Sequence, residues 1–182
     1  MERIQILCDI SEGRGSYSEQ RFQVLLTQFV AGCLNERSNA TLYFGINADG
    51  LIVGLSGERS ESQEHMTESI SSFFFPDQID LVSKCIWPLR FVETVTDESN
   101  SGTCQYVIEV DIVPAYKICE EDTIFIKKLK RGHSKPCSTH LFRINNGDVI
   151  ELTQREKLAK FIANIPKLSA NRKQGEEEKQ RW

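Results

Sequence analysis

The chain has 182 residues, of which 40% are hydrophobic and 26% are charged. These values are typical of one folded domain with a hydrophobic core. No segment approaches the roughly 18 apolar residues that a membrane span needs, and the first residues lack the apolar segment of a signal peptide. We therefore expect a cytoplasmic location without membrane contact. Because strand-like residues directly follow Met1, we also expect other domains of a larger parent protein as partners.

The formal net charge of −4 hides an asymmetry along the chain. Residues 1–83 hold 12 acidic and 5 basic side chains, whereas residues 84–182 hold 14 acidic and 17 basic side chains. A local patch of charge determines the local electrostatic field more than the total does. The acidic total therefore does not exclude nucleic acid as a partner.

The first predicted elements are a strand, a helix and a hairpin. Residues 3–10 alternate apolar and polar side chains, which is typical of a strand. Ser16 and Glu19 have the spacing of a capping box, and apolar residues at intervals of three and four predict a helix through Leu34. Residues 41–55 then predict a hairpin that turns at NADG.

The second half of the chain predicts mainly strands. A helix over residues 60–75, ended by Pro76, comes first. The segments predicted as strands are 85–95, 104–113 and 123–129, followed by a hairpin over 140–152 and a helix over 153–164. This order predicts an α+β fold with helices packed on a mostly antiparallel sheet. We expect one domain over residues 1–167 and a charged, frayed helical tail over 168–182.

Basic side chains concentrate after residue 123. Within residues 123–143, which contain no acidic residue, stand Lys127, Lys128, Lys130, Arg131, Lys135 and Arg143. A row of cations of this kind binds a phosphate backbone, because each contact releases condensed counterions. The alternative interpretation is a solvated loop whose lysines serve solubility.

Two other groups of residues suggest metal chemistry. Asp9, Glu12 and Asp49 follow predicted strands or turns, where carboxylates can hold Mg²⁺ or Mn²⁺ and activate water, although acids at such places commonly end strands. Cys85 and Cys119 could bind a structural zinc ion together with two of His133, Cys137 and His140. Their spacing matches no compact zinc module, so buried thiols are the alternative.

Several segments together resemble the Schlafen/AlbA-type domain. They are FVAGCLNERSNATLYFGINADGLIVGL, KCIWPLRFVE, YVIEVDIVPAYKIC and LFRINNGD, which follow one another in the order of that domain. The resemblance implies an α+β fold in a cytoplasmic antiviral and growth-restricting factor of innate immunity that binds double-stranded DNA or RNA. Some members of the family are metal-dependent ribonucleases that cut transfer RNA.

The resemblance carries over to this chain only in part. A basic residue of the family corresponds to Arg21 here, and two family cysteines correspond to Cys85 and Cys119. At two further positions where the family has basic residues, this chain has the uncharged Gln5 and Gln28. The acid that follows the family's F-G-I motif falls on an uncharged residue, one or two positions before Asp49. An uncharged side chain cannot serve as the general base of a nuclease. We therefore expect binding rather than cleavage.

The predicted function is that of a nucleic-acid-binding effector domain with transfer RNA or double-stranded DNA as partner. The residues predicted to contact phosphates are Arg21, Lys127, Lys128, Lys130, Arg131 and Arg143. One alternative is a metal-dependent endoribonuclease that acts on transfer RNA. The other is a protein-interaction module that has lost nucleic-acid binding.

Overall fold

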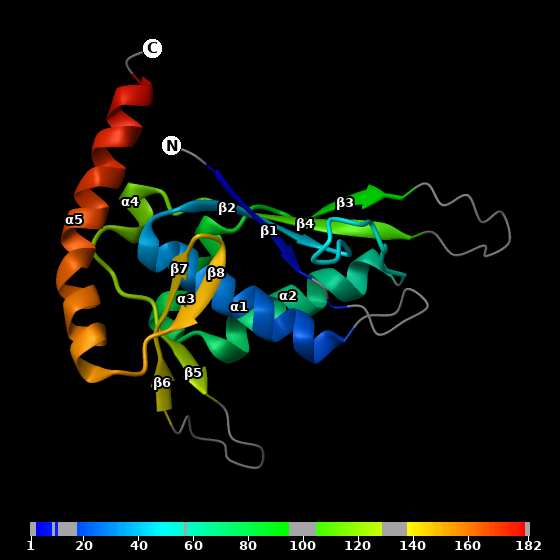
Figure 1. Cartoon of the computed structure of the whole chain (residues 1–182), viewed down its shortest axis with the longest axis horizontal. Helices are drawn as coiled ribbons and strands as arrows, with labels where there is room; N and C mark the ends of the chain where they lie inside the picture. Colours follow the sequence, from blue (N-terminus) through cyan, green and yellow to red (C-terminus); the bar gives the residue numbers. More distant parts are fainter. Residues whose placement is uncertain are drawn as a thin grey trace, which may run out of the picture.

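The computed structural model describes residues 3–8, 10, 18–56, 58–94, 105–128 and 138–180 (Figure 1). The elements follow one another as β1 (Arg3–Cys8), α1 (Glu19–Glu36), β2 (Asn39–Phe44), α2 (Arg59–Phe73), α3 (Pro76–Cys85), β3 (Arg90–Glu93), β4 (Tyr106–Ile112), α4 (Tyr116–Cys119), β5 (Ile126–Lys128), β6 (Ser138–His140), β7 (Phe142–Asn145), β8 (Asp148–Glu151) and α5 (Arg155–Gln180).

The main sheet has four strands in the order β1-β2-β4-β3. β1 and β2 run parallel and are joined through α1, as a parallel pair requires, while β2, β4 and β3 pair antiparallel. The pairs β5–β6 and β7–β8 are separate antiparallel ribbons. The predicted α+β fold with a mostly antiparallel sheet is thus confirmed.

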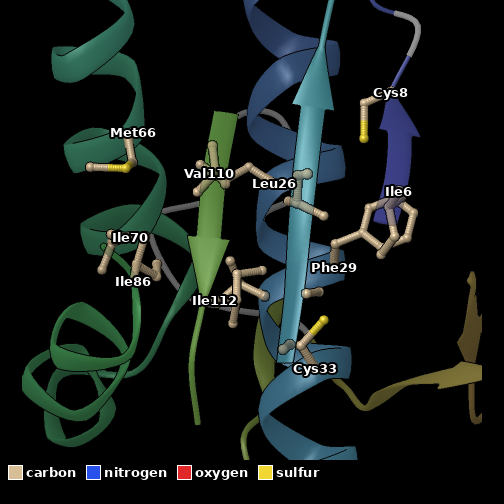
Figure 2. Close-up of a cluster of buried hydrophobic side chains, with 14 of the residues drawn as sticks. Ile6, Cys8, Leu26, Phe29, Cys33, Met66, Ile70, Ile86, Val110 and Ile112 are labelled. Atoms are coloured by element: carbon tan, nitrogen blue, oxygen red, sulfur yellow. The ribbon is translucent and has the colours of Figure 1, made fainter. Parts of the chain in front are cut away.

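Helices α1 and α2 cover one face of the main sheet. Alternate residues of β2, including Phe44, are buried on this face, and the Phe44 ring lies 4.6 Å from the ring of Phe22 in α1. Figure 2 shows Phe29 of α1 beside Ile6 of β1, and Met66 of α2 on the side of β4. Burial of these apolar side chains is the main stabilising term of the fold.

The β7–β8 hairpin packs directly on α1. A Cβ atom at Gly32 would lie 2.9 Å from Cδ1 of Ile144, so the absence of a side chain at this helical position permits the close approach. The hairpin turns at Asn146 and Gly147, which both have positive φ (52° and 89°). Asn-Gly is the preferred sequence for such a turn, and the prediction of a hairpin in this segment is confirmed.

The predicted hairpin over residues 41–55 forms only around its turn, where the backbone N–H of Gly50 donates to the carbonyl oxygen of Asn47 and Ile52 returns antiparallel to Ile46. β2 already has β1 on one edge and β4 on the other, so no edge is left for a returning strand. The predicted return strand is therefore reduced to single bridges, from Ile52 to Ile46 and from Leu55 to Tyr106 of β4.

Three other boundaries differ from the predicted ones. Pro76 does not stop the helical region but is the first residue of α3, a position where its missing N–H is not needed. Because α3 extends to Cys85, the strand predicted from residue 85 shortens to β3. The N-cap of α1 is Ser18 rather than Ser16, and its side-chain oxygen accepts a hydrogen bond from the backbone N–H of Arg21.

Helix α5 continues from Arg155 to Gln180, beyond the helix predicted to end at residue 164. It stands beside the end of the main sheet (Figure 1) and buries Phe161, Ile165, Ser169 and Arg172. The predicted domain boundary after residue 167 stays a prediction.

Among the described helices, none combines the length and apolar composition that crossing a membrane would require.

Candidate nucleic-acid interface

An open groove of about 400 Å³ runs between α1 and the two small ribbons. The α1 wall consists of Gln20, Gln23, Val24, Thr27 and Gln28, whose spacing of three and four residues places them on one side of the helix. The opposite wall consists of Ile126, Lys127, His140, Phe142 and Glu151, and Phe73 of α2 also lines the groove. The groove is therefore polar along the helix and mixed along the strands.

One of the predicted phosphate-binding residues lines this groove, and a second lies beside it on α1. Lys127 of β5 lines it, and its Nζ lies 3.5 Å from the carbonyl oxygen of Ser71 and 5.9 Å from the ring centre of Phe75. Arg21 is exposed on α1, seven residues before Gln28. Seven residues are almost two full turns, so the side chains of Arg21 and Gln28 leave the helix within about 20° of each other. Arg21 thus flanks the groove that Lys127 lines.

The other predicted cations are placed differently. Lys128 is the last residue of β5, and the structure describes its backbone alone. Lys130 and Arg131 lie outside the described residues. The Nε of Arg143 lies 2.8 Å from Oε1 of Glu36, and its guanidinium lies 5.3 Å from the ring centre of Phe161. Arg143 therefore joins α1, β7 and α5.

Glu36 is an ionisable group in a largely desolvated place. Burial raises the pKa of Glu36, and the charge and hydrogen bond of Arg143 offset this effect only in part. The ion pair therefore contributes to holding the hairpin on α1, although it does not fully compensate for the desolvation of the carboxylate.

Sequence reasoning missed several polar residues of the groove. The Oγ1 of Thr27 donates to the carbonyl oxygen of Gln23 at 2.8 Å, and Nε2 of Gln23 donates to Oε1 of Glu19 at 3.1 Å. On the other wall, Nδ1 of His140 is hydrogen-bonded to Oε1 of Glu151. One sequence pattern indicates this wall: polar residues recur at positions 20, 23, 27 and 28, beside the apolar face of the helix.

A buried asparagine fixes the two walls relative to each other. Nδ2 of Asn35 donates to the carbonyl oxygens of Ile124 and Phe142, each at 2.9 Å, and Oδ1 accepts from the backbone N–H of Ile124 at 2.8 Å. Asn35 is fully buried near the end of α1. These three bonds tie α1 to the segment that leads into β5 and to the first residue of β7.

Arg37 fixes the end of α1 in a similar way. It adopts a left-handed backbone conformation (φ 56°), and its side chain is 3% exposed. The guanidinium donates to the carbonyl oxygens of Leu34, of Glu120 at 3.1 Å and of Asp122 at 2.8 Å, and its Nε donates to Oγ of Ser169 in α5 at 3.1 Å. A single side chain thus joins α1, the segment after α4 and α5.

The predicted catalytic acids do not form a described site. Asp9 and Glu12 lie outside the described residues. Asp49 is exposed in the turn after β2, where Oδ1 of Asn47 accepts from the backbone N–H groups of Asp49 and Leu51. Within the described ranges, no three His, Cys, Asp or Glu side chains gather closely enough to hold a metal ion.

The predicted zinc ligands are only partly brought together. Sγ of Cys85 and Sγ of Cys119 are 3.5 Å apart, and both residues are fully buried. His140 lies at the groove, bonded to Glu151, while His133 and Cys137 lie outside the described residues. The pKa of Cys85 is lowered because the Cys119 thiol donates a hydrogen bond to its sulfur.

Together these features define an α+β domain with an open groove of mixed polar and apolar lining, which Lys127 lines and Arg21 flanks. No known family profile matches the chain. Its sequence is 26% identical to human sterile alpha motif domain-containing protein 9-like over 177 residues, covering 88% of this chain and 11% of that protein. It is 29% identical to the mouse 9-like protein over 162 residues, covering 83% of this chain and 10% of that protein.

A third relative is human sterile alpha motif domain-containing protein 9, which is 32% identical over 114 residues, 60% of this chain and 7% of that protein. The chain spans about a tenth of the length of the curated relatives it matches. The chain is therefore similar to this pair of paralogues over most of its own length. The assignment to the Schlafen/AlbA type stays a prediction.

Proposed function

We propose that this chain is a nucleic-acid-binding domain of the Schlafen/AlbA type, within a cytoplasmic antiviral and growth-restricting factor. The observation that carries the proposal is an open groove that Lys127 lines and that Arg21 flanks from α1. The similarity to sterile alpha motif domain-containing protein 9 and its 9-like paralogue supports it, because the ordered segments that indicate the Schlafen/AlbA type lie within the matched length.

Binding in this proposal depends mainly on the phosphate backbone. Arg21 and Lys127 contact phosphates on opposite sides of the groove, and Lys128, Lys130 and Arg131 extend the row of cations along the chain. The glutamines and Thr27 of α1 offer neutral hydrogen-bonding groups to the sugar and phosphate oxygens between them. Such contacts distinguish poorly between base sequences, so the domain binds with little sequence preference.

The test is a salt-titrated binding measurement on transfer RNA and on duplex DNA, comparing the wild type with the double variant Arg21→Glu/Lys127→Glu. We expect the double variant to bind at least tenfold more weakly at low salt. The slope of log affinity against log salt should become shallower by about two, one for each lost phosphate contact. Lys179→Glu is the matched control, because this exposed lysine lies 24 residues beyond the start of α5, about 36 Å along the helix.

Two results would overturn the proposal. One is unchanged affinity of a folded double variant, and the other is wild-type affinity that does not depend on salt, which would favour a protein-interaction module. The same reactions are repeated with Mn²⁺ and the length of the nucleic acid is checked. We expect the nucleic acid to stay intact. Cleavage of transfer RNA by the wild type, together with uncut transfer RNA in the presence of Asp49→Ala, would instead establish the endoribonuclease.

A further inference from the structure

The Cys85–Cys119 thiol pair stands apart from the groove and from the proposed binding function. Cys85 is the last residue of α3 and Cys119 the last residue of α4, so two separate helices bring the sulfurs together. Their Sγ atoms are 3.5 Å apart, within contact distance of each other, and neither residue is exposed. Of the four cysteines in the described ranges, this is the pair whose sulfurs are in contact.

The surroundings of this thiol pair hold no further metal ligand among the residues that the structure describes. The neighbouring groups are instead cationic and amide groups. Arg37 lies beside the pair and donates to the backbone carbonyl oxygen of Cys119 at 3.5 Å, and Val113 donates its backbone N–H to the carbonyl oxygen of Cys85 at 2.8 Å. The backbone at both cysteines is therefore fixed while the two side chains face each other.

We propose that Cys85 and Cys119 are a modification site, a redox-active thiol pair that hydrogen peroxide closes to a disulfide. The sulfurs need to approach by about 1.5 Å to reach bonding distance, which rotation of the two side chains can supply. Hydrogen peroxide is small enough to reach buried thiols during local opening of the fold. Disulfides of this kind in intracellular proteins are transient and redox-sensing rather than permanent.

The reaction balances with peroxide as the oxidant. One thiolate sulfur attacks a peroxide oxygen and the O–O bond breaks, so that a sulfenic acid forms and hydroxide leaves to become water with the proton of that thiol. The second sulfur attacks the sulfenic sulfur, the S–O bond breaks, and hydroxide leaves as a second water with the second proton. Two thiols and one peroxide give one disulfide and two waters.

Peptide mapping tests the proposal directly on the whole chain. The folded protein is treated with hydrogen peroxide, free thiols are blocked with N-ethylmaleimide in denaturant, and the protein is digested with trypsin. Cleavage after Lys84 and Lys117 gives the peptides CIWPLR and ICEEDTIFIK, each with one cysteine of the pair. We expect these two peptides to be joined, and to separate on reduction with dithiothreitol.

Two controls accompany the mapping. Cys8 and Cys33 should remain thiols, because burial raises the pKa of each to about 12 and keeps them protonated. Oxidation should also raise the melting temperature of the wild type by about 10 °C, because the bond closes a loop of about 35 residues, and this shift should be absent in Cys119→Ser.

Recovery of both peptides as maleimide adducts after peroxide treatment overturns the proposal. So does one zinc ion per chain in the purified protein that is lost in Cys85→Ser, because the pair would then be a metal site. Neither result depends on nucleic-acid binding, so the thiol pair and the groove succeed or fail separately.

Discussion

Replacing Asn35 by leucine tests whether the buried amide holds the two walls of the groove together. Leucine has the same number of side-chain heavy atoms with the same branching, so the change removes the polar atoms without leaving a cavity. Three hydrogen bonds are lost, and the N–H and carbonyl of Ile124 and the carbonyl of Phe142 lose their side-chain partner in a buried place. At about 1 to 1.5 kcal/mol for each bond, the free energy of unfolding should fall by about 3 to 5 kcal/mol.

Urea unfolding followed by circular dichroism measures this loss. With a slope of about 2 kcal/mol per molar urea, the midpoint should shift by about 2 M. Asn164→Leu is the matched control: this asparagine is exposed on α5, so its replacement should change the free energy of unfolding by less than about 0.5 kcal/mol. A loss below about 1 kcal/mol for the Asn35 variant would refute the reasoning, because the three bonds would then contribute almost nothing.

Three further predictions follow from the packing and the charges. Gly32→Ala places a Cβ atom 2.9 Å from Cδ1 of Ile144, so the free energy of unfolding, measured by thermal unfolding, should fall by about 1 to 3 kcal/mol. Adding Ile144→Val should restore part of this loss, and full stability of the single variant would contradict the prediction. Burial raises the pKa of Glu36, so the folded state binds a proton more tightly than the unfolded state, and the free energy of unfolding should fall as pH rises from the ordinary glutamate pKa to the raised value. In Glu36→Gln this fall, measured by urea titrations at several pH values, should be smaller; an identical pH profile would show that another group causes it. Lys128→Glu with Lys130→Glu should abolish retention of nucleic acid in a gel-shift assay at low salt, and unchanged retention by the folded variant would remove both lysines from the interface.

The parts of the fold that the sequence predicts well are those that local rules determine. The apolar spacing of α1 and the Asn-Gly turn of β7–β8 depend on residues close to one another in the chain. The partners of β2 are instead strands distant in the chain, β1 and β4, and the NADG turn carries no information about them. The sequence does not predict α3, because a proline such as Pro76 can either follow the end of one helix or begin the next. Which of the two occurs depends on the burial of Val82 and Cys85 in the folded chain.

The candidate site divides in the same way. Arg21 and Lys127 could be named from charge and from the resemblance, because both depend on residue type at a given position. The pairing of Arg143 with Glu36 could not, because the hairpin must first pack on α1 before the two charges meet. The hydrogen bond between His140 and Glu151 is equally a product of the tertiary structure, since it joins β6 and β8, which belong to two different ribbons.

The way in which Arg37 is held has a consequence for acid tolerance. The guanidinium of Arg37 donates to backbone carbonyl oxygens and, through its Nε, to a hydroxyl oxygen, and none of these acceptors gains a proton between neutral and mildly acidic pH. A carboxylate in their place would lose its charge on acidification and release the cation. The hydrogen bonds by which Arg37 joins α1, the segment after α4 and α5 should therefore persist in acid after the ion pairs elsewhere have weakened.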